Sequence, residues 1–413
     1  MRKWVLLLLL LLTFGSVPTF AQTNESPLLQ MLARVPDTPS AREYISYVDY
    51  KALLAARQGV PQITTWEQLS TLLSSKSKEG RLAMAALQGI QSGPEFYARY
   101  FMQAGDAPSV VGFDLLTIER AIEFGSLPDS GDILEGSFDA QAVAAAHEKR
   151  GYTSSDLNSL TLLCPAAGCD SGKQLDMAQI NPANPFGGEL GRSQPVLVGD
   201  NLVASSPNID TVRSIASAIA DPSTSLADQP DYRAAAEAIS ANGTLIQSYL
   251  IRPADIQSAA AIIATSRLSA AQIKRLTDQL RADFVPMPAY NLIALADIAT
   301  DSEQQALVAL VYTNQADAEA AAALFPDRLG KYTSLATQRV VSDLLTERGV
   351  TSVDTSVYAA STKRSVLVIT LHAPLPSSAI PADGSPLQSS SLIYSLLVRV
   401  YMSRDLGWLA TQF

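Results

Sequence analysis

The stretch from Gly131 to Ala220 limits the fold of this chain most strongly, because strand-like and helix-like patterns alternate in it at short intervals. Short apolar and β-branched runs predict strands, and Ala-rich runs between them predict helices. The turn sequence Gly199-Asp200-Asn201 predicts a hairpin between two such strands. The expected order is strand, helix, strand, hairpin and helix, over 133–138, 140–149, 159–164, 196–204 and 209–220.

A similar layout returns after Pro286-Met287-Pro288, which marks a boundary. Two strand-like runs precede Asn314, which can cap an Ala-rich helix as Asp139 can cap the earlier one. Two further strand-like runs follow, and a helix with apolar rows starts near Leu392. We therefore predict an α+β protein with two related units of antiparallel sheet and helices packed on one face, preceded by a helical N-terminal region.

The length of 413 residues favours more than one domain. Thr65-Trp66-Glu67-Gln68 matches a capping box and predicts a helix start in the N-terminal part, whereas Val110 to Leu115 is a β-prone run. The expected segments are a signal peptide (1–21), a mainly helical N-terminal region (22–105), a first α+β unit with a disulfide loop (106–285) and a second α+β unit with a C-terminal helix (286–413).

The first residues predict export. Arg2 and Lys3 precede an apolar run from Val5 to Leu12, and Thr19-Phe20-Ala21 suits cleavage by signal peptidase. The run is shorter than the roughly 20 residues of a membrane-spanning helix. We expect a secreted, periplasmic or cell-surface protein with no membrane span in the mature chain. The alternative is that the segment is retained as an anchor.

The formal net charge of −10 disfavours nucleic acid as a partner, since binding to phosphates requires concentrated basic surface. The two cysteines, Cys164 and Cys169, predict a disulfide in an exported chain. We expect no metal and no cofactor, because the two histidines are His147 and His372 and neither belongs to a helical zinc pair. His372 ends an apolar strand, where we expect backbone groups to bond its ring.

Enzyme motifs are weak in this sequence. Ser75 to Lys78 matches Ser-x-x-Lys, but the Ser-Asp-Asn and Lys-Thr-Gly elements of penicillin-binding enzymes are absent. Carboxylates remain as an acid/base or calcium hypothesis. Four of them gather near one turn, namely Asp129, Asp132, Glu135 and Asp139. Their spacing does not follow a calcium loop, and a solvated turn with a helix cap explains them as well.

The most unusual loop runs from Asn181 to Arg192, and its candidate ligand-binding residues are Asn184, Phe186, Gly187, Gly188 and Arg192. Glycines allow close approach of a partner to the backbone, Phe186 offers a stacking face and Arg192 can hold a carboxylate. The other interpretation is a long crossover with Phe186 tucked into the core.

These observations favour a non-enzymatic binding or interaction module of the bacterial envelope, whose partner is an envelope component, a protein or a small solute. The alternative hypothesis is an exported hydrolase that uses carboxylates as acid and base. A structural cell-surface protein tethered by its N-terminal segment is a third possibility.

Overall fold

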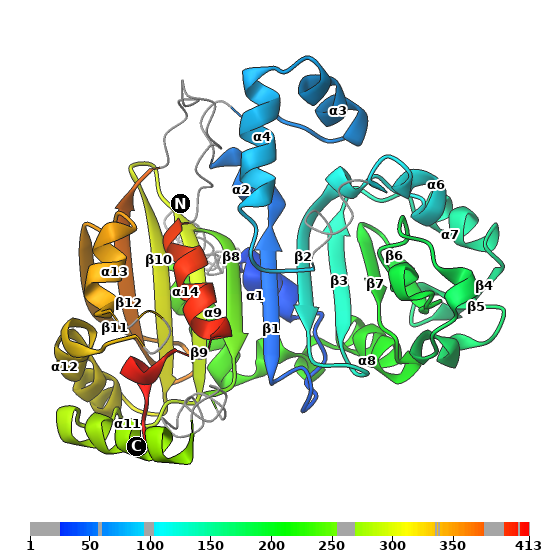
Figure 1. Ribbon diagram of the computed structural model, residues 1–413. Coiled ribbons are helices and arrows are strands. Elements are labelled where there is room, and N and C mark those ends of the chain that lie inside the picture. Colours follow the sequence, from blue (N-terminus) through cyan, green and yellow to red (C-terminus); the bar gives the residue numbers. More distant parts are fainter. Residues whose placement is uncertain are drawn as a thin grey trace, which may run out of the picture.

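The computed structural model describes residues 25–56, 60–94, 103–253, 269–334, 337, 339–375, 392–403 and 405–412. The predicted signal peptide therefore lies outside the described residues. The described part forms one antiparallel sheet of 12 strands with helices packed against it (Figure 1). The α+β class expected from the sequence is confirmed.

The strands follow the spatial order β11-β12-β10-β9-β8-β1-β2-β3-β7-β6-β5-β4. Their bounds are β1 Tyr44–Asp49, β2 Ile118–Phe124, β3 Gly131–Gly136, β4 Tyr152–Leu157, β5 Leu160–Pro165, β6 Val196–Gly199, β7 Leu202–Ser205, β8 Thr244–Ile251, β9 Leu292–Ala299, β10 Glu303–Tyr312, β11 Ser352–Ala359 and β12 Ser365–Pro374. The helices are α1 Pro27–Leu32, α2 Tyr50–Ala55, α3 Trp66–Ser74, α4 Lys78–Gln88, α6 Ala107–Val111, α7 Ala140–Glu148, α8 Ile209–Ala220, α9 Pro230–Ser240, α11 Ala270–Asp283, α12 Gln315–Lys331, α13 Val341–Glu347 and α14 Leu392–Met402.

The strand order contains the two related layouts expected from the sequence. In one half, β1, β2 and β3 form a meander, and β7 returns beside β3 after α7. In the other half, β8, β9 and β10 form a meander, and β12 returns beside β10 after α12 and α13. The first half has an extra hairpin, β4–β5, at its outer edge. The strand β1, from the N-terminal region, pairs with both β2 and β8 and so joins the halves.

Helices cover both faces of the sheet rather than one. Alternate residues of β9 enter different cores, with Leu292 and Ala294 on one face and Ile293 and Leu295 on the other. The first face is covered mainly by α1, α8 and α9. The second is covered by α12, α13 and α14 over one half and by α3, α4, α6 and α7 over the other. In Figure 1, α14 lies in front of β9 and β10, whereas α1 lies behind β1.

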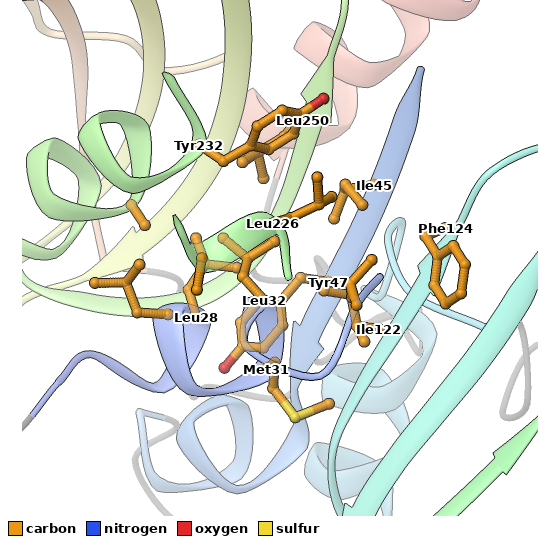
Figure 2. Packing of buried hydrophobic residues seen from close by; sticks show 14 of the residues in the cluster. Leu28, Met31, Leu32, Ile45, Tyr47, Ile122, Phe124, Leu226, Tyr232 and Leu250 are labelled. Carbon is orange, nitrogen blue, oxygen red and sulfur yellow. The ribbon is translucent and has the colours of Figure 1, made fainter. Parts of the chain in front are cut away.

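The short helix α1 fills the centre of the first face. Its residues Leu28, Met31 and Leu32 are fully buried. Figure 2 shows them in one cluster with Tyr47 of β1 and with Leu226, which comes from a distant part of the chain. Because this six-residue helix packs in one core with β1 and with the remote turn at Leu226, its packing ties the N-terminal segment to the sheet.

Side-chain caps fix several helix starts where the sequence predicts them. The Oδ1 atom of Asp139 accepts hydrogen bonds from the backbone N–H groups of Gln141 and Ala142, at 2.9 and 3.2 Å. Asn314 accepts from the N–H of Asp317 at 2.9 Å. Such caps satisfy backbone donors that the first helical turn leaves without partners. The predicted starts of α7 and α12 are confirmed.

One predicted strand is wrong. The β-prone run Val110 to Leu115 forms the end of α6 and the single 3-10 turn Leu115–Thr117. Pro108 lies in the first turn of α6, where its fixed φ suits a helix, and Gly112 ends the helix at φ +84°. Local stop and start signals therefore prevail over the β preference of two valines. Within the described ranges, no helix is both long and apolar enough to cross a bilayer.

Truncation of Leu32 to alanine should destabilise the protein by about 2–5 kcal/mol, because it opens a cavity in the centre of the first face. Urea unfolding followed by circular dichroism would measure the change. The matched control is Met402→Ala, a 60% exposed side chain at the end of α14, which should leave the midpoint nearly unchanged. Equal midpoints for the two variants would contradict the role assigned to α1.

Candidate functional site

The candidate site is the long loop between β5 and β6. Cys164, at the end of β5, and Cys169 form the expected disulfide, with Cα atoms 4.8 Å apart. Three 3-10 turns follow in the loop, at Cys169–Lys173, Met177–Gln179 and Gly188–Leu190. The disulfide closes the first turn of the loop against the strand, so the loop starts from a fixed position.

The inner side of the loop is held by Phe186. This side chain is 1% exposed, and its ring centroid lies 6.4 Å from that of Phe113 and 6.3 Å from that of His147. Asn184 is also buried, and its Oδ1 accepts from the N–H of Phe186 at 3.2 Å. The interpretation with Phe186 in the core therefore describes the structure. The ring anchors the loop and is not placed to stack on a ligand.

The glycines let the loop pack on itself. Gly188 accepts from the N–H of Asn181 at 2.8 Å and donates to the carbonyl of Asn184 at 3.1 Å. Gly191 has φ +65°, and a Cβ there would collide with the carbonyl oxygen of Asp176. Gly187 also has positive φ, at +76°. The close approach predicted for a partner is used by the loop's own backbone.

Arg192 ends the loop in a half-buried position. Its backbone N–H donates to the carbonyl of Gly187 at 3.0 Å. No carboxylate among the described residues forms an ion pair with its guanidinium. Of the five residues predicted to bind a ligand, the structure thus places Asn184, Phe186, Gly187 and Gly188 in the internal framework of the loop, and Arg192 at its edge.

The outer side of the loop carries exposed apolar side chains that the sequence analysis did not single out. In the described part of the chain, seven large hydrophobic residues are exposed, and four of them lie in this loop. We call these four residues the loop apolar set: Leu175, Met177, Ile180 and Leu190, which are 60, 75, 42 and 43% exposed. The two 3-10 turns that carry Met177 and Leu190 are held side by side by the contacts of Gly188 and Gly191, and Leu175 and Ile180 flank the first of these turns.

Acidic residues lie close in sequence to the loop apolar set. Asp170 and Asp176 are exposed and Glu189 is half-buried, whereas Lys173 is the exposed base of the same stretch. The Oδ1 atom of Asp176 accepts from the N–H of Ala178 at 3.0 Å, which fixes the turn that presents Met177. The loop therefore combines exposed apolar side chains with a small excess of negative charge.

The four predicted acids near the β2–β3 turn do not form one site. Asp129 accepts from Asn208, at 2.6 Å between the side-chain atoms, and Asp139 caps α7. Glu135 pairs with Arg34 and with Arg120, the latter at 2.8 Å. Asp132 lies on the other face of β3, because its neighbour Leu134 belongs to the second face whereas Ile133 belongs to the first. Asp132 and Glu135, two of these four acids, therefore cannot act together on one substrate.

A different pair of carboxylates does face each other. Glu123 of β2 is directly opposite Asp132 of β3, and both are half-buried. Burial and then the charge of Glu123 raise the pKa of Asp132 well above that of an exposed aspartate. Like charges directly opposite on neighbouring strands repel. A proton on Asp132 therefore removes both the cost of burying its charge and the repulsion from Glu123.

One of the two histidines has a different environment from the one expected. His147 is buried in α7, and its Nδ1–H donates to the carbonyl of Val143 at 2.9 Å. Burial lowers its pKa to about 4. His372 was expected to be bonded by backbone, which is wrong: its Nδ1 lies 2.9 Å from Glu303 and its Nε2 lies 3.1 Å from Asp354. Strand pairing places these side chains on one face, near the starts of β10 and β11 and the end of β12.

Among the described residues, no three His, Cys, Asp or Glu side chains gather closely enough to hold a metal ion. No protein-family model matches the chain, and no curated protein matches it. Two solved structures are similar to it, described as crystal forms III and I of TP0453. They have TM-scores of 0.30 and 0.29 at 9 and 10% identity, cover 88% of this chain in each case, and are themselves covered over 97 and 96% of their length.

Phe186→Ala should lower the stability by about 3–5 kcal/mol, because it removes the buried ring that anchors the loop. Leu190→Ala in the same loop is the matched control and should change the stability by about 0.5 kcal/mol or less, since its side chain is 43% exposed. Chemical denaturation of both variants gives the comparison. If Phe186→Ala unfolded at the wild-type midpoint, the anchoring role would be rejected.

Asp132→Asn should flatten the dependence of stability on pH. The folded-state pKa lies above the unfolded value of about 3.9, so the folded chain holds an extra proton. This contribution is complete below about pH 4 and is lost as the pH rises through the folded-state pKa. Unfolding midpoints measured from about pH 4 to about pH 8 test this. Glu123→Gln should flatten the profile partly, and a wild-type slope in Asp132→Asn would contradict the assignment.

Proposed function

We propose that the protein is a non-enzymatic interaction protein of an extracytoplasmic compartment, and that it binds a protein partner through the loop apolar set. The observation that carries the proposal is the concentration of exposed apolar side chains on one anchored loop. Soluble proteins rarely expose such groups together unless the surface contacts a partner.

The anchoring of the loop supports the proposal. The disulfide, the buried ring of Phe186 and the turn around Gly188 fix the backbone beneath the loop apolar set. A surface that is ordered before binding loses less conformational entropy on association. Loops held by a rigid scaffold commonly carry binding functions. Leu175 and Met177 are therefore presented as contacts and are not needed for the core.

The charges around the set indicate the chemistry of the partner. In this loop the three acids Asp170, Asp176 and Glu189 outnumber the two bases Lys173 and Arg192, and the whole chain has a net charge of −10. A complementary face has an apolar groove bordered by Lys or Arg side chains. Anionic lipid and nucleic acid are disfavoured by the same sign of charge. The extracytoplasmic location is supported by the disulfide between Cys164 and Cys169, which persists in oxidising compartments.

Hydrolysis by carboxylates is the second candidate function, and the facing pair of Glu123 and Asp132 favours it. A carboxyl group with a raised pKa beside a second carboxylate is the arrangement that a general acid and a general base require. The Asp132→Asn variant also tests this candidate function. Loss of a defined peptide or glycoside hydrolysis in the folded variant would support this candidate over the interaction protein.

The double variant Leu175→Ser with Met177→Ser should bind the partner at least about tenfold more weakly, because central apolar contacts contribute more than about 1 kcal/mol. The partner is first captured by crosslinking in an envelope extract and then titrated as a purified protein by calorimetry. Higher salt should weaken the wild-type complex, because it screens the attraction between the acidic residues of the loop and the basic residues of the partner. The matched control, Met402→Ser, changes an exposed methionine outside the loop and should bind as the wild type does.

Three results would reject this form of the proposal. A purified partner that binds the double variant as tightly as the wild type would place the interface elsewhere. Light scattering that reveals a dimer lost in the double variant would make the partner a second copy of this chain. Sedimentation with phosphatidylcholine vesicles, again lost in the double variant, would make it a lipid surface.

A further inference from the structure

A pocket of about 380 Å³ lies between α2, the extended residues 60–64, α4 and the start of β2. It is separate from the loop apolar set, which lies between β5 and β6. In Figure 1, α2 and α4 rise above the middle of the sheet, while β5 and β6 lie at one end of it. Pockets of this volume are in the range that holds small organic ligands.

The floor of the pocket is apolar and well ordered by the core. It is lined by Leu87 of α4, Leu116 of the 3-10 turn before β2, and Ile118 of β2, with 4, 8 and 2% of their surfaces exposed. Leu54 of α2 and Ile63 add to the apolar walls. An apolar ligand group that enters this space exchanges water contacts for contacts with side chains that are already fixed by packing.

The solvent side of the pocket carries one pair of opposite charges. The Nζ atom of Lys51 lies 3.1 Å from an Oε2 atom of Glu119, and both residues line the pocket. Their side chains are 66 and 33% exposed. An ion pair so exposed contributes little to stability, so a ligand can replace it at small cost. A ligand with one charge leaves one of these two groups without its partner, whereas a zwitterion satisfies both.

We propose that this pocket binds a small apolar α-amino acid. Its carboxylate takes the place of Glu119 beside Lys51, its ammonium group takes the place of Lys51 beside Glu119, and its side chain lies on Leu87, Leu116 and Ile118. The pocket volume lies in the range of sites that hold small ligands. L-Phenylalanine is a ligand of this class with an apolar side chain and both charges, and it is the probe of choice.

Calorimetric titration compares L-phenylalanine with two analogues that keep the ring and one charge, 3-phenylpropanoate and 2-phenylethylamine. The amino acid should bind at least about fivefold more tightly than either analogue, because each of its charges gains a charge-assisted hydrogen bond. In Lys51→Met the preference over the amine should vanish. In Glu119→Gln the preference over the acid should vanish. Lys274→Met, an exposed lysine of α11, is the matched control and should bind as the wild type does.

Thermal unfolding of each variant without ligand shows that it is folded before it is titrated. The proposal is overturned if phenylalanine does not bind to the folded wild type at millimolar concentration. It is also overturned if both analogues bind as tightly as the amino acid, or if Lys51→Met and Glu119→Gln keep the wild-type preferences. None of these results depends on the loop apolar set, so this test and that of the interaction surface can fail separately.

Discussion

Backbone pairing of β1 with β2 on one side and with β8 on the other is the interaction on which the rest of the structure depends. Ile45 is opposite Phe124 in one ladder and Leu250 in the other. Among the described strands, the pairing of β1 with β8 is what connects the first meander with the second, so this six-residue strand makes one sheet of both halves. On one face, Arg120 connects Asp49 of β1 with Glu135 of β3, at 3.3 and 2.8 Å. This partly buried set of charges fixes the register around the junction.

The sequence carries the local features of the fold well and the distant ones poorly. Asp139 and Asn314 predict helix starts correctly because a cap requires only its own first turn. The sequence-based prediction placed helices on one face of the sheet only, although the unbroken apolar run from Leu307 to Tyr312 indicates that both faces are covered. A strand with one face in water would instead alternate apolar and polar residues. The strand Tyr152–Leu157 was missed for the opposite reason, because an exposed edge strand has no apolar pattern to detect. Pairing of β1 with β8 leaves no local signal at all.

The candidate site shows the same division. The unusual composition of the loop from Asn181 to Arg192 was visible in the sequence, but the function of each residue was not. Phe186 is an anchor because a core of Phe113 and His147 lies beneath it, and the sequence does not place those residues there. The exposed side chains of Leu175 and Met177 are the opposite case, since no local pattern in the sequence shows that the core leaves them out. An exposed apolar side chain can be recognised only when the residues that occupy the core are known.

The position of β1 also has a consequence for the order of events on the ribosome. β1 emerges early and can form its ladder with β2 as soon as the first meander is complete, whereas Gln247, the partner of Val48 on its other side, is made much later. Throughout that interval the middle of the finished sheet is an open strand edge, with a row of unpaired N–H and C=O groups. The nascent chain is thus most exposed to wrong pairing at its eventual centre. This edge can close only after β8, Thr244–Ile251, has been made, and such a long-range pairing slows the folding of the chain.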